Sequence, residues 1–513
     1  MPQPPEMTRQ PVQKVLIANR GEIAGRIARG CRVLGIQSVA VFSEADATAR
    51  HVRLADEAVC VGPAESAASY LNIAAILQAA RKTGADAVHP GYGFLSENTV
   101  FAQAVQDAGL TWIGPPASVI APIQSKTAAK AVAAAAGVPT APAAIIDDDS
   151  PAALAKIAAE VGLPLLVKPQ DGGGGKGMQK VTRIEDFAAA VAAARRIAAS
   201  AFSSDRLFVE RYVENARHVE VQVLGDRHGT VVHCFERECS LQRRHQKVIE
   251  ESPCSILTTA ERTRIAESGR AFAAQVGYQG AGTVEFLFDP VSREHYFLEM
   301  NTRLQVEHPV TEVVLGLDLV VAQLRIARGE RVQDILGEPL TQRGHGIEVR
   351  VYAEDPAAGY VPQVGTLLRA DWPDVPFVRV DAGFAAGDAV PMHYDPMLAK
   401  IIAWGRTRNE AADRMVAALR ETTVHGVVTN IPFLLALLQE PAFRNAEIDT
   451  GWLDRTWGNT APGQSADVSD TAMLVLGALV AAPLPTGKGS QSAQPAQETS
   501  EPWNQLQGWR LGA

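Results

Sequence analysis

Residues 299–307 read Glu-Met-Asn-Thr-Arg-Leu-Gln-Val-Glu, and no other stretch of the chain says more about its function. Every second residue in it is polar and able to bind a ligand, and these residues are Glu299, Asn301, Arg303, Gln305 and Glu307. Successive side chains of an extended strand point to opposite faces, so a strand through this stretch would place all five on one side. Alternation alone more often indicates an amphipathic strand with one solvated face. The neighbouring segments favour a ligand-binding edge of a sheet.

Residues 283–288 form a second strand-like run, and the turn-forming residues 289–293 join it to the first. The resulting hairpin would bring Glu285 beside Glu299. Two adjacent carboxylates repel each other unless a cation lies between them. Carboxylate oxygens and the Asn301 amide suit Mg²⁺ or Mn²⁺ and not zinc. The hairpin is therefore a predicted metal site, and because Mg²⁺ in such sites usually also holds substrate phosphates, a phosphate site is expected nearby.

A glycine-rich loop supplies the predicted phosphate site. Residues 168–178 read Lys-Pro-Gln-Asp-Gly-Gly-Gly-Gly-Lys-Gly-Met, between predicted strands at 163–167 and 179–181. The four consecutive glycines are Gly172, Gly173, Gly174 and Gly175. Their unobstructed N–H groups can form an anion-binding concavity, although the loop lacks the Gly-Lys-Ser/Thr ending of a Walker loop. A glycine run alone is more often a flexible linker, but the flanking Lys168 and Lys176 favour a flap over a nucleotide.

Composition sets the broad class of protein. A chain of 513 residues is long enough for three or four domains, and its 47% apolar and 20% charged content is ordinary for a soluble protein. A net charge of −9 argues against nucleic acid as a partner. Five cysteines without a Cys-x-x-Cys pair indicate reduced thiols and a cytoplasmic location. The apolar run at 472–482 is shorter than the ~20 residues that span a bilayer, so no membrane segment is expected.

The first part of the chain alternates strands and helices. The strands are predicted at 15–18, 38–42 and 87–89, and the first helix at 21–34. This order predicts a parallel sheet covered by helices. Only one glycine follows the first strand, where the dinucleotide fingerprint needs three, so NAD binding is poorly supported. Further along, Ser150 and Pro151 predict a helix start, and residues 349–352 and 398–404 read as strands.

A cluster of charged residues at 236–247 packs donors for an anionic ligand. Such a cluster is ordinarily a solvated face, but glutamates bracket its basic residues, which suits a compact site better than a nucleic-acid patch. Arg350 is an isolated cation in an apolar strand. Its plainest interpretation is a structural ion pair with Glu354 or Asp355.

Taken together, the motifs resemble the biotin carboxylase family and occur in that family's order. They lie at residues 18–24, 89–98, 172–175, 237–247, 299–309, 394–397 and 426–430. Several are ten or more residues long, and together they cover roughly residues 12–455, so a chance match is implausible. Members of this family carboxylate N1′ of biotin with ATP and bicarbonate, through carboxyphosphate.

The resemblance implies an ATP-grasp fold of mixed α/β and α+β class. Its expected parts are a Rossmann-like N-terminal domain at 12–125, an ATP-grasp domain at 126–335 with a lid at about 140–212, a biotin carboxylase C-terminal domain at 345–455 and a linker-like tail at 460–513. Phosphoryl transfer chiefly needs positioning and charge neutralisation, which a metal clamp, lysines and a glycine lid supply. Closing the lid would exclude water from carboxyphosphate.

The resemblance also implies roles for single residues. The ATP-binding residues would be Lys126, Lys168, Gly172, Gly173, Gly174, Gly175, Glu210, Val213, His218, Gln242, His245 and Leu287. Two Mg²⁺ or Mn²⁺ ions would be bound by Glu285, Glu299 and Asn301. Bicarbonate would be bound by Lys247, Arg303, Gln305 and Val306. The catalytic residues would be Glu307, Arg303, Lys247 and Arg350. Of these, Glu307 would act as general base and Arg350 would stabilise the biotin enolate; the Arg303 fork suits a planar anion.

The chain departs from the family pattern in three places. Residues 169–171 (Pro-Gln-Asp) replace the small residues that normally lead into the glycines, Ser125 stands where a glycine commonly precedes the lysine, and Arg211 stands where lysine is frequent. These departures bear on lid geometry and nucleotide affinity, and not on the reaction class.

The biotin carrier is expected elsewhere. Biotin is usually attached to a lysine flanked by methionine, and the chain has no Met-Lys pair, so we expect no covalent biotin on it. Residues 503–511 resemble the opening of the region that leads toward the carrier domain in single-chain acyl-CoA carboxylase α subunits, which favours a shortened unit over a stand-alone subunit. The expected partners are a biotin carboxyl carrier domain, a carboxyltransferase subunit and a second copy of the chain. Two other functions stay open: another bicarbonate-activating ATP-grasp ligase, such as carbamoyl-phosphate synthase, and a catalytically silent nucleotide-binding subunit.

Overall fold

The computed structural model describes residues 12–170, 177–202, 204–244 and 246–458. The predicted glycine flap at 172–175, the residue His245 and the predicted tail at 460–513 lie outside the described residues.

A five-stranded parallel sheet forms the N-terminal part of the chain, in the order β3-β2-β1-β4-β5. Its strands are β1 (Lys14–Ile17), β2 (Gln37–Ser43), β3 (Glu57–Gly62), β4 (Ala87–His89) and β5 (Thr111–Trp112). Its helices are α1 (Gly21–Val33), α2 (Arg50–Leu54), α3 (Ile73–Thr83), α4 (Thr99–Asp107) and α5 (Ala117–Ile120). The predicted alternation of strands and helices and the parallel pairing are confirmed.

The segment predicted as a lid forms a four-stranded antiparallel sheet in the order β6-β9-β7-β8. Its strands are β6 (Ala143–Ile146), β7 (Leu165–Pro169), β8 (Gln179–Val181) and β9 (Leu207–Arg211). The neighbouring helices are α6 (Lys126–Ala135), α7 (Pro151–Val161) and α8 (Phe187–Phe202). Helix α7 begins where the sequence predicts, because Pro151 occupies its first turn and the Ser150 side chain accepts a hydrogen bond from the Ala153 N–H.

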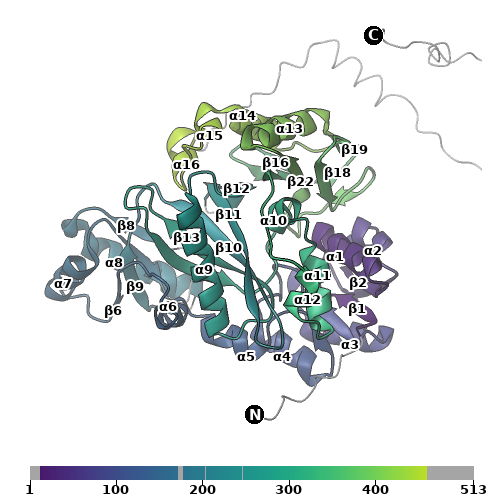
Figure 1. The fold of residues 1–513 in the computed structure, drawn as a ribbon, viewed down its shortest axis with the longest axis horizontal. Helices are drawn as coiled ribbons and strands as arrows, with labels where there is room; N and C mark the ends of the chain where they lie inside the picture. The colour runs from purple at the N-terminus through teal and green to yellow at the C-terminus, as the bar shows by residue number, and fades with distance from the viewer. Residues whose placement is uncertain (1–11, 171–176, 203, 245, 459–513) are drawn as a thin grey trace, which may run out of the picture. The chain divides into compact units, whose positions relative to one another are not determined.

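The site is built on an eight-stranded sheet in the order β14-β13-β10-β11-β12-β15-β22-β20 (Figure 1). Its strands are β10 (Arg217–Gly225), β11 (Val231–Arg243), β12 (Gln246–Ser252), β13 (Gly280–Phe288), β14 (His295–Asn301), β15 (His345–Tyr352), β20 (Val378–Ala382) and β22 (Met397–Gly405). All its pairs are antiparallel. Strand β12 pairs with β15, so the predicted ATP-grasp and C-terminal segments share this sheet.

Helices and short strand pairs complete the fold. The remaining helices are α9 (Thr259–Gln275), α10 (His308–Leu315), α11 (Leu319–Ala327), α12 (Val332–Leu336), α13 (Arg408–Glu421), α14 (Ile431–Gln439), α15 (Pro441–Arg444) and α16 (Trp452–Thr456). The short strands are β16 (Glu354–Asp355), β17 (Val361–Pro362), β18 (Gly365–Thr366), β19 (Arg369–Asp371), β21 (Ala389–Val390) and β23 (Thr423–His425).

The two faces of the eight-stranded sheet differ around β12 and β15. Ile347, Val349 and Val351 point to one face, where they pack with apolar residues of α13 and α14 in a buried cluster. Because side chains alternate along a strand, Glu348 and Arg350 point to the opposite face. We call the first the helix face and the second the site face.

Candidate active site

A cavity of about 920 Å³ brings together the residues that the sequence singles out. Every predicted site residue among the described part of the chain lines it, with the exception of Glu307. The lining members of that set are Lys126, Lys168, Glu210, Val213, His218, Gln242, Lys247, Glu285, Leu287, Glu299, Asn301, Arg303, Gln305, Val306 and Arg350. The volume falls within the range of small-molecule sites, which is roughly 300–1,000 Å³.

The predicted hairpin is confirmed, since β13 pairs with β14 and Glu285 lies directly opposite Glu299. Glu285 Oε1 accepts hydrogen bonds from Asn301 Nδ2 at 2.8 Å and from Gln305 Nε2 at 3.0 Å. Burial alone would raise the pKa of Glu285, but the nearby Lys247 and His218 hold it well below its usual value. Burial and the charge of Glu285 raise the pKa of Glu299. A buried acid beside a half-buried acid and an amide fits a divalent cation with oxygen ligands.

The predicted strand through residues 299–307 is wrong beyond Asn301, where β14 ends. The Thr302 N–H donates to Glu97 Oε1 at 3.1 Å instead of to a neighbouring strand. Pro309 occupies the first turn of α10, and Glu307 stands at its N-cap position without a side-chain capping hydrogen bond. Glu307 is therefore not on the cavity surface with the other four alternating residues, but lies buried behind it.

Lys247 links three carboxylates in the site. Its Nζ donates to Glu220 Oε2 at 2.6 Å, to Glu285 Oε1 at 3.0 Å and to Glu307 Oε1 at 2.6 Å. Burial would lower the pKa of this lysine, but the three carboxylates raise it well above its usual value. This largely buried ammonium donates charge-assisted hydrogen bonds to three acids, and an anion in the cavity could accept one of them instead.

Glu307 lies between two cations. Its Oε1 accepts from Lys247 and its Oε2 accepts from an Arg350 guanidinium nitrogen at 3.0 Å. Burial would raise the pKa of Glu307, but Lys247, Arg350 and Arg237 lower it below its usual value. The carboxylate is thus ionised at neutral pH, with one cation at each of its oxygens.

Arg350 does not pair with the acids that the sequence suggests. Its Nε donates to Glu250 Oε1 at 2.7 Å, and its other contact is with Glu307. Glu354 pairs instead with Arg243 at 3.1 Å. The prediction of Glu354 or Asp355 is wrong because Arg350 instead meets Glu250, whose register partner on β15 is Glu348, and Glu307, which precedes α10.

Arg303 points its guanidinium into the cavity and is held by polar groups around it. Its Nε donates to Glu97 Oε2 at 3.1 Å, and its terminal nitrogens donate to Asn301 Oδ1 at 3.1 Å and to Gln305 Oε1 at 3.3 Å. Glu97 belongs to the N-terminal part of the chain, so the arginine is oriented by contacts from two distant segments. The planar Arg303 guanidinium has paired N–H donors that match the geometry of small oxyanions.

The other end of the cavity is rich in lysine. Lys168 on β7 and Lys130 on α6 both donate to Glu210 on β9. Lys126 lies one helical turn before Lys130, and burial lowers the pKa of both lysines. Three cations around one acid suit the phosphates of a nucleotide.

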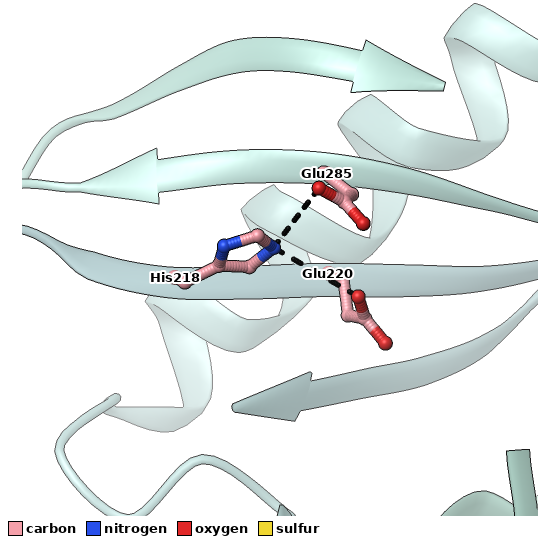
Figure 2. A group of neighbouring side chains, drawn as sticks. All are labelled: His218, Glu220 and Glu285. Carbon is pink, nitrogen blue, oxygen red and sulfur yellow. Dashed lines mark ion pairs between the residues drawn. The ribbon is translucent and has the colours of Figure 1, made fainter. Parts of the chain in front are cut away.

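Figure 2 shows His218 with its imidazole directed toward two acids. Its Nε2 lies 3.1 Å from Glu285 Oε2 and 3.9 Å from Glu220 Oε2. Gln242 Nε2 lies 2.9 Å from the other ring nitrogen, and an amide nitrogen can only donate. Nδ1 is therefore the acceptor and Nε2 carries the proton toward Glu285. One ligand atom from each of these three side chains lies within 4.8 Å of the others, but a protonated Nε2 has no lone pair with which to bind an ion.

Sequence reasoning misses four charged residues that the structure places in the site: Glu97, Glu220, Glu250 and Lys130. The alternation of residues 218–222 (His-Val-Glu-Val-Gln) is a signal that could have found Glu220, and the spacing of four from Lys126 could have found Lys130. Glu250 is one of the glutamates that bracket the charged cluster at 236–247, but nothing local in the sequence assigns it to Arg350, and nothing local distinguishes Glu97.

Three family models match successive parts of the chain. Residues 11–120 match the biotin carboxylase N-terminal domain, 125–335 the ATP-binding domain of the carbamoyl-phosphate synthase L chain, and 348–455 the biotin carboxylase C-terminal domain.

Related proteins agree with these matches. The biotin carboxylase of Haemophilus influenzae is 46% identical over 87% of this chain and 99% of its own length. The mitochondrial methylcrotonoyl-CoA carboxylase α subunit of rice is 49% identical over 86% of this chain, which spans 60% of that subunit. The solved biotin carboxylase domain dimer of Hydrogenobacter thermophilus 2-oxoglutarate carboxylase, bound to Mg-ADP, ADP and bicarbonate, is 42% identical, with a TM-score of 0.80 over 87% of this chain and 98% of that one.

The antiparallel sheets around a lysine-rich and acid-rich cavity define an ATP-grasp enzyme, an ATP-dependent ligase. Within that class, the chain belongs to the biotin carboxylase family. In the part of the chain that the structure describes, no helix combines the length and apolarity needed to cross a membrane.

Proposed function

We propose that the protein carboxylates biotin on a separate carrier, using ATP and bicarbonate, as the first half-reaction of an acyl-CoA carboxylase. The observation that carries the proposal is the position of Lys247, which lies within 3.0 Å of three carboxylates beside the Glu285–Glu299 pair. The proposal is supported because the ammonium of Lys247 and the Glu285–Glu299 pair line one end of the cavity, with the ionised Glu307 directly behind them.

At the lysine-rich end, Lys126, Lys168 and His218 would bind the phosphates of ATP, and Glu210 and the Val213 backbone would bind adenine. Glu285, Glu299 and Asn301 would hold two Mg²⁺ or Mn²⁺ ions, whose chemistry is to neutralise charge on the transferred phosphoryl group. Gly172–Gly175 would cover the nucleotide from the lid.

At the acid-rich end, the Arg303 fork, Lys247, Gln305 and the Val306 backbone would bind bicarbonate. Glu307 would take the bicarbonate proton, so that the bicarbonate oxygen attacks the γ-phosphorus of ATP and ADP leaves. The product of this step is carboxyphosphate.

The carboxyl group would then pass from carboxyphosphate to N1′ of biotin, with inorganic phosphate as the leaving group that takes up the N1′ proton. N1′ loses its proton, and negative charge develops on the ureido oxygen. Arg350 is the cation placed to stabilise that charge, since it lies at the cavity wall beside Glu307. To do so, Arg350 exchanges part of its contact with Glu250 and Glu307 for the substrate oxygen.

The proposed partners follow from the same half-reaction. Biotin would arrive on a carrier domain, and a carboxyltransferase subunit would pass the carboxyl group to an acyl-CoA of its own choice. The Hydrogenobacter relative is described as a dimer, and we propose a homodimer for this chain as well.

The deciding experiment measures ADP release with Mg²⁺, ATP and bicarbonate, with and without free biotin. We expect bicarbonate-dependent ADP release that biotin accelerates. The central domain matches a carbamoyl-phosphate synthase model, so ammonia is the matched alternative acceptor. Stimulation by ammonia without an effect of biotin would assign the chain to that reaction, and no bicarbonate-dependent release would favour a silent nucleotide-binding subunit.

A further inference from the structure

Two buried acids lie next to each other behind Arg350. Glu250 on β12 pairs in register with Glu348 on β15, and neither side chain is exposed. Arg350 binds only one oxygen of Glu250, and Glu250 Oε2 has no hydrogen-bond partner among the described residues. Neither carboxyl oxygen of Glu348 has one either, within the same part of the chain. Three unpartnered oxygens on two adjacent buried acids are a rare arrangement that requires an explanation.

The charged groups around Glu348 do not balance two negative charges. Those that face it are Lys400 on β22, Glu250 on β12, Arg350 on β15 and Glu307 at the start of α10. Lys400 is committed elsewhere, because its Nζ donates to the Val306 carbonyl at 2.6 Å and pairs with Glu22 at 3.1 Å. No ion pair within 4.0 Å reaches Glu348 in the described residues.

The remaining surroundings add no cation. Helix α10 also packs on β15, and it contributes His308 near Lys400. Burial lowers the pKa of His308 well below its usual value, so this imidazole is neutral. Helices α13 and α14 cover the opposite face with apolar side chains. Burial raises the pKa of Glu348 well above its usual value and that of Glu250 to about 7.

We propose that Glu348 holds a proton that it shares with Glu250 Oε2, and that through Glu250 it sets how tightly Arg350 is held. Glu348 is therefore a positioning residue, since it acts through two other side chains. A protonated carboxyl donates one O–H, and the register pair Glu250 offers an oxygen without another donor. This arrangement gives two of the three unpartnered oxygens a hydrogen bond with one proton, and it needs no second cation.

The consequence concerns the mobility of Arg350 and rests on the proposed function. If both acids were ionised, two buried negative charges would attract the guanidinium and hold it away from the biotin oxygen. With the shared proton, Arg350 has one fully ionised partner, Glu307, and a second partner, Glu250, whose negative charge is reduced. When Glu307 accepts the bicarbonate proton, the guanidinium has a net positive charge to offer to the enolate.

The first experiment detects the proton directly by infrared difference spectroscopy at neutral pH. We expect the carbonyl stretch of a protonated carboxylic acid in the wild type, and its loss in Glu348→Gln, which keeps the size of the side chain. Glu421→Gln, at an exposed position, is the matched control and should remove no such band. A wild-type spectrum in which Glu348→Gln changes only ionised carboxylate bands would overturn the proposal. This readout is independent of biotin, so it stands whether or not the proposed function fails.

The second experiment compares pH profiles of biotin-dependent ADP release and of the slower release without biotin. In the wild type, biotin-dependent release should fall at alkaline pH when the shared proton dissociates. The amide of Glu348→Gln cannot lose that proton. The alkaline limb of the variant's biotin-dependent profile should therefore shift to higher pH by at least one unit, and its biotin-free profile should not shift. Coincident wild-type and variant profiles would contradict the positioning role.

A third variant separates this role from simple packing. Glu348→Leu leaves Glu250 Oε2 without a donor, so we expect about a tenfold loss of biotin-dependent kcat, while the KM for ATP stays within twofold. Glu348→Gln should remain within threefold of the wild type at neutral pH, because its amide still donates. Equal losses in both variants would overturn the proposal.

Discussion

Glu250 and Glu251 are neighbours on β12, yet they point to opposite faces of the sheet and their pKa values shift in opposite directions. On the site face, burial raises the pKa of Glu250 to about 7, and one of its oxygens has no partner within the described residues. On the helix face, burial would raise the pKa of Glu251, but Arg408 and His345 lower it to about 2. Both oxygens of Glu251 are bound, at 2.6 and 3.1 Å from Arg408.

The difference separates two uses of buried charge. The helix face pairs its acid with cations and so contributes to stability. The site face holds acids and cations that are incompletely satisfied, which costs stability but leaves groups free to meet a substrate. Substitutions on the site face should therefore change turnover, and those on the helix face should change unfolding.

Glu307→Gln should have the largest effect on turnover. The amide cannot take the bicarbonate proton, so we expect a loss of about 10³-fold in biotin-dependent ADP release. ATP affinity should stay within threefold in a direct binding measurement, because Glu307 does not line the cavity. Glu338→Gln, an exposed glutamate, is the control. Unchanged turnover would remove Glu307 from the proposed role of base.

Lys247→Ala should lower turnover by at least ~10²-fold, as expected when one charge-stabilising donor is removed. The substitution also leaves Glu220, Glu285 and Glu307 without their shared cation. Steady-state kinetics with varied bicarbonate would show the loss, and the exposed Lys156→Ala is the control. A loss under threefold would mean that bicarbonate binds elsewhere.

Lys168→Ala tests the lysine-rich end of the same cavity. The proposed phosphate contact is a charge-assisted hydrogen bond, so its removal should raise the KM for ATP by about tenfold, with a smaller change in kcat. The kinetics of ATP and bicarbonate, measured separately, would distinguish the two ends. An effect on the KM for bicarbonate alone would contradict the division of the cavity.

Glu251→Gln should have the smallest effect on turnover and a clear effect on stability. It leaves Arg408 without its acid, so we expect a loss of about 3 kcal/mol in the free energy of unfolding and kcat within twofold of the wild type. Denaturant unfolding and ADP release would measure the two quantities. A large loss of activity at unchanged stability would reverse the assignment of the faces.

The same variant predicts a change in pH dependence. Folding lowers the pKa of Glu251 from 4.5 to about 2, so its contribution to stability is complete above about pH 4.5 and is lost as the pH falls through about 2. The wild type should lose stability over this window, and Glu251→Gln should lose less. Parallel curves for the two proteins would contradict the ion pair.

Local chemistry accounts for what the sequence could predict. The Glu285–Glu299 pair follows from two strand-like runs and a turn, and the parallel sheet follows from alternating strands and helices. The extended strand beyond Asn301 could not be excluded, because the residue that redirects the chain, Glu97, is far away in sequence. The predicted ion-pair partner of Arg350 is wrong for the same reason, because the register of β12 against β15 determines which acid lies near Arg350. The roles assigned to the site residues stay predictions.

The claim that the site face of the sheet binds the substrates is tested most directly by a crystal structure with Mg²⁺, ADP and bicarbonate. We predict that bicarbonate lies within hydrogen-bond distance of Arg303 and of Lys247 Nζ, beside Glu307, with metal ions on Glu285 and Glu299. Bicarbonate bound only among the lysines around Glu210, with Lys247 still held by all three carboxylates, would contradict the account.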